Sequence, residues 1–443
     1  MTDPTPAPPA TLTLHTGDPS LCTPGSNLAP LPATYATLYA ITSNGVVALN
    51  ASDGSQRWRW TDNSHTLTDY VTADASNVYA NAFQPGGGTA HITALGAADG
   101  VVRWQLQLVN ALGASSTEAK LVVSDGVVYA AVTDGTLRAL DGATGASRWT
   151  AQIGVMGSYP ALTLSSGVIF ASYAHDDYAT NPTTLESYHV AVRAGDGTVL
   201  WQAQTKSHSS VLGAANGFMY TADSPPVPST LTAFNAATGD VRWHVVVGTG
   251  GVEVLVAAGT GIYYDVNSGD GLVSTYALNA SNGALCWARL VQGNAPPGEI
   301  SSPVLDGKLM YDKAVCADPG PTDFGKGCLY AVDARTGENR WLIQDKGAFF
   351  ARITPDSLVN NVIYLNAIPA VALRADSGAI IWSDSAPSMP ISIGPTSSAL
   401  QVVGTTVYVA YPDGSVRALN AADGTVRWNV TLGGPITHLV AGA

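Results

Sequence analysis

One eleven-residue pattern recurs nine times along the chain and restricts the folds that the chain can adopt. The first copy is ALNASDGSQRW at 48–58, and the last is ALNAADGTVRW at 418–428. Ala opens every copy, Gly holds the seventh position and Trp closes it. From Trp58 to Trp428 is 370 residues over eight intervals, or about 46 residues per repeat. A period of this size is typical of a propeller blade or a solenoid coil.

Each copy has the pattern of two β-strands joined by a tight turn. In the last copy, Ala418–Asn420 ends one strand, Asp423-Gly424 turns, and Thr425–Trp428 begins the next strand. Glycine suits such a turn because it adopts a positive φ without steric cost. Upstream of each copy lies a short apolar run such as VVYA at 127–130, and before most of these lies another, such as SSPVLDG at 301–307. Four short strands per repeat, joined by hairpins, make one propeller blade.

The closing Trp of each copy is expected to pack one blade against the next. One indole ring buries about 150–250 Å², and a blade cannot bury its flat face alone. We therefore expect docking rather than ligand stacking at all nine positions, which are Trp58, Trp104, Trp149, Trp201, Trp243, Trp287, Trp341, Trp382 and Trp428. Six copies place an Arg before the Trp, and its stem is expected to lie over the edge of the ring.

The pattern A-[LV]-[DN]-A-x-[TD]-G-x-x-x-W after a VYA strand resembles the PQQ-like (quinoprotein-type) propeller repeat, and the resemblance covers residues 35–443. It implies an all-β fold, a single closed β-propeller of four-stranded blades. The family includes quinoprotein alcohol dehydrogenases and outer-membrane-protein assembly lipoproteins, and this chain resembles the non-catalytic lipoproteins more. Eight blades are usual in the family. The nine copies favour nine blades, with eight and one displaced or split repeat as the alternative.

The two ends of the chain are expected to meet in one blade. Only one clear strand, Leu38–Ala40, precedes the first copy, whereas PITHLVAGA at 435–443 follows the last copy and looks like an innermost strand without its blade. A C-terminal strand that completes the N-terminal blade would close the ring and leave no open edge. Residues 31–443 are thus predicted to form the propeller, and residues 1–30 a Thr/Pro-rich linker segment.

The composition excludes several kinds of partner. Charged residues make up only 12% of the chain, and the net charge is −13, which disfavours nucleic acid and anionic lipid as partners. No apolar run approaches the ~20 residues that a transmembrane helix needs. The start, MTDPTPAPPATL, has no signal-peptide pattern. We nevertheless expect an extracellular, periplasmic or cell-surface monomer whose export signal is absent from this sequence.

Four cysteines in a Lys-poor chain indicate an oxidising compartment. Cys316 and Cys328 bracket a Pro/Gly-rich loop and are expected to pair, which leaves Cys22 for Cys286. Four free structural thiols are the alternative. There is no CxxC, and no second Cys or His stands at zinc spacing, so no metal site is predicted from the cysteines.

Four consecutive repeats have long segments between their second and third strands, at 171–190, 221–230, 264–274 and 312–328. We call the face that carries these segments the expanded-loop face, and it is the candidate binding face because loops carry function more often than scaffolds do. Candidate binding residues on it or at the channel mouth are His65, Tyr159, Asp176, Asp177, His208, Glu253, Glu299 and Arg352. Solvated rim groups are the alternative interpretation.

Two kinds of chemistry are open to these candidates. Glu253 and Glu299, from adjacent repeats, could bind a cation or serve as acid and base. Calcium is the metal that the oxygen-rich runs 175–177 and 265–270 could bind, although neither fits the twelve-residue EF-hand loop.

The motifs of the related enzymes are missing from the sequence. Resemblance to the quinoprotein dehydrogenases would imply an adjacent Cys-Cys pair over the quinone, and this chain has none. It also lacks CxxCH, GxSxG, HExxH and P-loop motifs. We therefore expect no catalytic residue and no cofactor, least of all PQQ. The sequence favours a non-catalytic scaffold, secreted or surface-attached, that binds a protein or glycan. A PQQ- or calcium-dependent oxidoreductase with a divergent site is the alternative.

Overall fold

The computed structural model of the protein describes residues 12–28, 36–42, 45–62, 66–83, 90–108, 119–154, 159–177, 184–205, 209–223, 229–248, 251–267, 272–292, 303–316, 326–344, 357–365, 369–384, 400–411 and 413–442. The chain divides into two compact units. Unit 1 comprises Met1–Pro30, Asp223–Thr232 and Arg242–Met389, and unit 2 comprises Leu31–Ala222, Ala233–Val241 and Pro390–Ala443.

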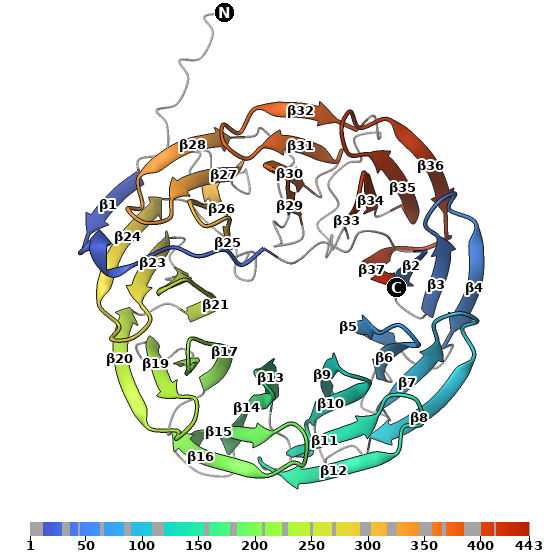
Figure 1. Ribbon diagram of the computed structural model, residues 1–443, viewed down its shortest axis with the longest axis horizontal. Helices are drawn as coiled ribbons and strands as arrows, with labels where there is room; N and C mark the ends of the chain where they lie inside the picture. Colours follow the sequence, from blue (N-terminus) through green and yellow to red (C-terminus); the bar gives the residue numbers. More distant parts are fainter. Residues whose placement is uncertain are drawn as a thin grey trace, which may run out of the picture. The chain divides into compact units, whose positions relative to one another are not determined.

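Nine sheets, one for each copy of the repeat, form the described chain, and each has four strands except one that has a fifth (Figure 1). They are the blades of a β-propeller, so the all-β, nine-bladed prediction is confirmed and the eight-bladed alternative is wrong. A 3-10 helix, η1 (Pro19–Leu21), is the one helical element in the described residues. No helix in this part of the chain is long and apolar enough to cross a membrane.

The blades are numbered 1 to 9 in the order of the repeats. Blade 1 consists of β37 (Ile436–Gly442), β2 (Thr37–Thr42), β3 (Gly45–Asn50) and β4 (Gln56–Thr61). Blade 2 consists of β5 (Thr66–Ala73), β6 (Asn77–Phe83), β7 (Ala90–Gly96) and β8 (Val102–Leu108). Blade 3 consists of β9 (Ala119–Ser124), β10 (Val127–Val132), β11 (Thr136–Asp141) and β12 (Ser147–Gln152). Blade 4 consists of β13 (Tyr159–Ser165), β14 (Val168–Asp177), β15 (Thr184–Arg193) and β16 (Val199–Thr205). Blade 5 consists of β17 (Ser209–Ala215), β18 (Phe218–Asp223), β19 (Ser229–Asn235) and β20 (Val241–Gly248).

The remaining blades follow the same order. Blade 6 consists of β21 (Gly251–Ala258), β22 (Gly261–Asn267), β23 (Leu272–Asn279) and β24 (Leu285–Gln292), with β1 (Leu12–Thr16) as a fifth strand. Blade 7 consists of β25 (Val304–Leu305), β26 (Leu309–Cys316), β27 (Lys326–Asp333) and β28 (Asn339–Gln344). Blade 8 consists of β29 (Leu358–Val359), β30 (Val362–Leu365), β31 (Val371–Arg374) and β32 (Ile380–Ser383). Blade 9 consists of β33 (Leu400–Val403), β34 (Thr406–Ala410), β35 (Ser415–Asn420) and β36 (Val426–Thr431).

The two ends of the repeat array meet within unit 2. Strand β37 pairs antiparallel with β2, from Leu38 opposite Ala441 to Thr42 opposite Ile436. The indole Nε1 of Trp428 in blade 9 donates to the carbonyl oxygen of Ala51 in blade 1 at 3.1 Å. The prediction that a C-terminal strand completes the N-terminal blade is confirmed, and the first and last repeats are neighbours.

The repeat is explained by contacts between each Trp and the following copy. The Trp Nε1 donates to the backbone carbonyl at the fourth position of the next copy, at 2.8–3.1 Å. The acceptors are Ala97, Gly142, Ala194, Ala236, Ala280, Ala334, Ala375 and Ala51, for Trp58, Trp104, Trp149, Trp201, Trp243, Trp287, Trp341 and Trp428 respectively. Trp382 packs beside Tyr364 of its own blade, with ring centroids 6.0 Å apart.

In seven copies, the glycine at the seventh position faces the Trp that donates to that copy. Gly100 has a φ of 68°, and a Cβ added there would lie 2.5 Å from Cε3 of Trp58. Any other residue would therefore meet both backbone strain and a steric clash. The core lies between successive blades, where buried Tyr39, Trp58, Val78 and Leu95 belong to one cluster from blades 1 and 2.

The arginine that precedes the Trp lies at a β-bulge. In blade 3, Ala139 pairs with Trp149 and Leu140 pairs with Ser147, so Arg148 is the extra residue on β12. Its guanidinium Nη2 lies 2.8 Å from Oδ2 of Asp141 in the same blade. Hydrogen bonds from Arg148 and Thr144 lower the pKa of Asp141 to about 2. This arginine stabilises its own hairpin turn.

The segment interpreted as a linker is folded over residues 12–28. Strand β1 pairs antiparallel with β24, from Leu12 opposite Val291 to Thr16 opposite Trp287, so β24 is not the edge of blade 6. The backbone of the segment stays close to that of blade 6 just after β1. A Cβ added to Gly17 would lie only 2.1 Å from the carbonyl oxygen of Leu285. The Thr/Pro-rich composition of residues 1–30 concealed this strand.

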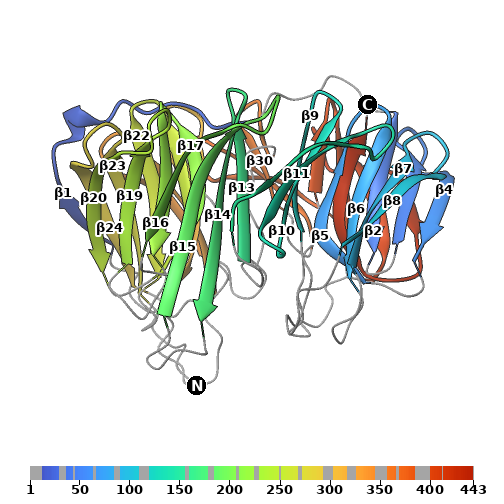
Figure 2. The ribbon, with the colours of Figure 1, turned by 90° about the horizontal axis from the view of Figure 1, so that it is seen from below.

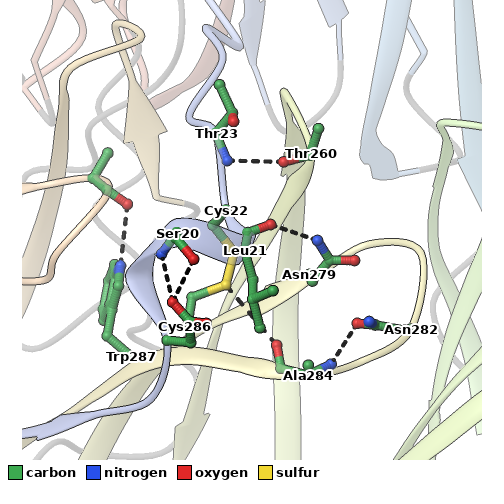
Figure 3. Close-up of a disulfide and its surroundings, with 12 residues drawn as sticks. Ser20, Leu21, Cys22, Thr23, Thr260, Asn279, Asn282, Ala284, Cys286 and Trp287 are labelled. Carbon is green, nitrogen blue, oxygen red and sulfur yellow. Dashed lines mark hydrogen bonds between the residues drawn. A yellow bond between two sulfur atoms is a disulfide. The ribbon is translucent and has the colours of Figure 1, made fainter.

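The disulfide Cys22–Cys286 fastens this segment to blade 6 (Figure 3). Around it, the Nδ2 of Asn279 donates to the carbonyl of Leu21, and the backbone N–H of Thr23 donates to Oγ1 of Thr260 at 2.8 Å. Further on, the N–H of Leu305 in blade 7 donates to Oδ1 of Asn27 at 2.8 Å. We call residues 12–28 the N-terminal strap, and it connects two blades of unit 1.

Candidate functional site

The predicted site residues fall mainly outside the described structure. His65, His208, Glu299 and Arg352 lie outside the described residues. For four others the backbone is described and the side chain is not, and these are Tyr159, Asp176, Asp177 and Glu253. Tyr159 begins β13 opposite Ala174, and Glu253 lies at a register shift in β21. A binding role for these eight residues stays a prediction.

Part of the expanded-loop face consists of extended strands rather than loops. Strands β14 and β15 form a hairpin of ten residues each, paired as far as Asp177 opposite Thr184 (Figure 2). The runs 175–177 and 265–267 are therefore strand backbone, and the prediction of calcium-binding loops at these residues was wrong about their local structure. No group of three or more His, Cys, Asp or Glu residues that could hold a metal occurs among the described residues.

The two predicted cysteine pairs have different outcomes. Cys22 and Cys286 form a disulfide, with Cα atoms 6.1 Å apart. Cys316 and Cys328 lie on the paired strands β26 and β27, where Cys316 is opposite Lys326 and Cys328 is opposite Ala314. Their side chains are outside the described part of the structure, so this second pair stays a prediction.

A buried Ser–His cluster connects blades 4 and 5 within unit 2. The Oγ of Ser209 forms a 2.8 Å hydrogen bond with Nε2 of His189, and both residues are fully buried. Burial lowers the pKa of His189 to about 4, so the imidazole is neutral at pH 7. The backbone N–H groups of Ser209 and Val211 donate to the hydroxyls of Ser187 and Ser172.

The chemistry of this cluster is structural. A serine hydroxyl beside a neutral imidazole matches the nucleophile and base of a hydrolase. However, the side chains of Ser209 and His189 do not contact solvent. The neighbouring hydroxyls of Ser187 and Ser172 accept hydrogen bonds from backbone amides of β17. The cluster therefore attaches the first strand of blade 5 to blade 4.

A second buried polar cluster connects blades 6 and 7 in unit 1. The hydroxyl of Tyr330 donates to Oδ2 of Asp312 at 3.1 Å and is 3.1 Å from Oγ1 of Thr275, which therefore donates to it. Cζ of Arg289 lies 5.3 Å from the centre of the Tyr330 ring, and its Nη1 donates to the carbonyl of Gly337. Burial, followed by the negative charge of Asp312, raises the pKa of Tyr330 well above its ordinary value.

Sequence periodicity contains a signal for this second cluster. The residue two positions after the motif Trp is apolar in seven of the nine copies, and the two exceptions are Arg289 and Asp384. Both are buried. A charged residue at an inward-facing position of a strand needs a buried partner, and this alternation could have identified Arg289.

A histidine–carboxylate pair connects blades 1 and 2. Nε2 of His91 in β7 lies 3.0 Å from Oδ2 of Asp62, which follows β4, and both side chains are nearly buried. The pair lies where β4 ends and β7 begins, which is the expanded-loop end of these blades. Together, the described polar clusters connect adjacent blades, and none forms an open site.

Comparison with known proteins places the chain in a family. The profile of a family described as "Outer membrane protein assembly factor BamB" matches residues 23–161, 187–368 and 314–438. BamB of Yersinia pestis is 27% identical over 356 residues, which are 74% of this chain and 77% of that protein. A tetrathionate hydrolase of Acidithiobacillus ferrooxidans is 27% identical over 314 residues, 65% of this chain and 60% of the hydrolase.

Solved structures show weaker likeness. BamB from Moraxella catarrhalis aligns with a TM-score of 0.46 and 19% identity, over 64% of this chain and 79% of that one. A europium-containing methanol dehydrogenase aligns with a TM-score of 0.45 and 13% identity, over 84% of this chain and 81% of the enzyme. Likeness at this level does not bear on function. On the match of the sequence profile, the chain belongs to the family described as outer membrane protein assembly factor BamB.

Proposed function

We propose that this protein is a non-catalytic scaffold of the cell envelope that binds a protein partner on its expanded-loop face. The observation that carries the proposal is the family match, which spans most of the chain and includes relatives named as assembly factors of outer membrane proteins. The described polar clusters support it, because their side chains connect blades and are buried away from any substrate.

The envelope location has independent support in the N-terminal strap. Its disulfide forms and persists in oxidising compartments such as the periplasm or the cell surface. The names of the relatives favour a protein over a glycan as the partner. The long hairpin of β14 and β15 is the best-described feature of the expanded-loop face, and we assign it to the contact with the partner.

Co-purification tests the proposal. The tagged chain, cross-linked in the envelope of its own host and purified, should carry one or a few envelope proteins in defined proportion. Recovery of the chain alone after cross-linking would contradict the scaffold function.

Tetrathionate hydrolysis is the second candidate, favoured by the 27% identity to the Acidithiobacillus ferrooxidans enzyme. The match covers only 60% of that hydrolase and 39% of a second one from Acidianus ambivalens, so part of each enzyme has no counterpart in the alignment. Incubation of the purified chain with tetrathionate tests this function, and consumption above that of a heat-unfolded sample would favour it. A divergent oxidoreductase is tested by adding PQQ and Ca²⁺ and measuring dye reduction and a thermal shift.

A further inference from the structure

The N-terminal strap shows that the outer edge of a blade can accept another strand. Strand β1 adds to β24 through five consecutive antiparallel pairs, from Trp287 to Val291. The edge of β24 is thereby covered, and Ala288, which follows the motif Trp, is buried. In seven of the other eight blades, the residue at this position is exposed.

The sequence distinguishes two outer strands from the rest. Three positions after the motif Trp stands a polar residue in seven copies, namely Thr61, Gln107, Gln152, Gln204, Gln344, Ser385 and Thr431. Only two copies have an apolar residue there, Leu290 in β24 and Val246 in β20. One of these two strands is the strand that β1 covers.

Strand β20 has the features of β24 without the cover. Both strands have eight residues, and Trp243–Val247 corresponds to the stretch of β24 that β1 pairs with. Within the described residues, β20 ends its sheet, so its outer backbone edge has no neighbouring strand. Val246 is 64% exposed, among the highest fractions for large apolar side chains here. Single exposed valines are common, but this one stands at a position that holds a polar residue in every other uncovered blade.

We propose that the outer edge of β20 is a second binding site, which takes an extended, neutral or acidic polypeptide segment as an added antiparallel strand. Main-chain hydrogen bonds would supply most of the affinity, and Val246 would select an apolar side chain opposite it. The exposed side chains of Arg242 and His244 and the lack of a carboxylate in β20 favour a segment without basic residues. A second folded copy fits less well. Each copy carries a net charge of −13, so two copies repel each other. The area that one eight-residue strand edge can bury is also far below the roughly 1,200 Å² of a stable interface.

The site is separate from the expanded-loop face, and its test is independent of the proposed scaffold function. The probe is a fluorescent hexapeptide of alternating threonine and valine with one glutamate, and its binding to the full chain is measured by anisotropy. Val246→Lys should weaken binding by about tenfold or more, because a charge at a strand edge opposes strand addition. The matched variant Gln204→Lys, at the same position of blade 4, should bind like the unaltered chain. Hydrogen exchange should show that the peptide protects amides of residues 243–247.

Three results would overturn the proposal. A peptide that is N-methylated at alternate amides has the same side chains and cannot form the ladder, so equal binding of that peptide would exclude strand addition. Equal loss of affinity in Val246→Lys and Gln204→Lys would exclude β20 as the site. Tighter binding of a peptide of residues 10–18 of this chain, together with dimers that Val246→Lys abolishes, would make a second copy the occupant.

Discussion

The indole of Trp58 lies so close to Gly100 of the next blade that a Cβ on the glycine would be 2.5 Å from its Cε3. The same contact recurs between Trp104 and Gly145 and between Trp149 and Gly197. The glycine and the Trp of the repeat are therefore one interaction, formed between consecutive copies. Gly54 of the first copy makes this contact with Trp428 of the last copy, which is why the pattern occurs at both ends of the chain.

Gly100→Ala should destabilise the protein by about 2 kcal/mol or more, through backbone strain and overpacking together. Gly167→Ala is the matched control, because Gly167 has a similar φ of 75° and no atom lies within 4 Å of a Cβ built there. Urea unfolding of both variants measures the difference. Equal losses would show that the contact with the Trp adds nothing beyond backbone strain.

Trp341→Phe should cost about 1–3 kcal/mol, because it leaves the buried carbonyl of Ala375 without its 2.8 Å donor. Trp60→Phe is the control, since Trp60 is the Trp outside the repeat and its N–H makes no hydrogen bond within the described structure. Thermal unfolding compares the two. If both substitutions lower the midpoint equally, ring size rather than the hydrogen bond explains the loss.

Acid should destabilise the protein in a pH window set by His189. Its pKa is about 4 in the folded chain and about 6.5 when unfolded, so the unfolded state binds the proton more readily. The stability from this residue is complete above pH 6.5 and is lost as the pH falls towards 4, by about 3 kcal/mol in total. His189→Gln should flatten the stability curve in this window. An unchanged slope between pH 6.5 and 4 in this variant would show that other groups cause the loss.

Removal of the disulfide should release the N-terminal strap. Cys22→Ser with Cys286→Ser should cost about 2–5 kcal/mol and increase hydrogen exchange in β24, whose edge β1 covers. In the native chain both cysteines are buried, so a thiol reductant should act only after unfolding. Rapid reduction of the folded protein, or unchanged exchange in β24 of the double variant, would contradict this account of the strap.

The architecture was predictable because each repeat carries its own strand, turn and docking signals. Nine Trp residues at a regular spacing indicated nine blades, and an unpartnered strand after Trp428 indicated the closure with β2. The strap was not predictable in the same way. Its strand has five residues in a Thr/Pro-rich segment, and its pairing with β24 joins positions more than 270 residues apart, for which a repeat pattern has no signal.

The polar clusters were missed for a related reason. Ser209 and His189 come from different repeats and meet only through blade packing, so no local spacing connects them. Arg289 was detectable as a charge at an inward-facing position, whereas its partners Tyr330 and Asp312 were not. The side chains of the eight predicted binding residues lie outside the described structure and remain subjects for experiment.

The most direct test of the central claim is partner binding with a shortened hairpin in blade 4. Joining Ala174 to Ser187 through an Asn-Gly turn removes the outer part of β14 and β15 and keeps the pair that these residues form. Quantitative co-purification from cross-linked envelopes, with the Gly167→Ala variant as a folded control, measures the effect. The account predicts that the partner proteins are lost from the shortened variant while its unfolding midpoint is unchanged. Undiminished recovery of the same partners would contradict it.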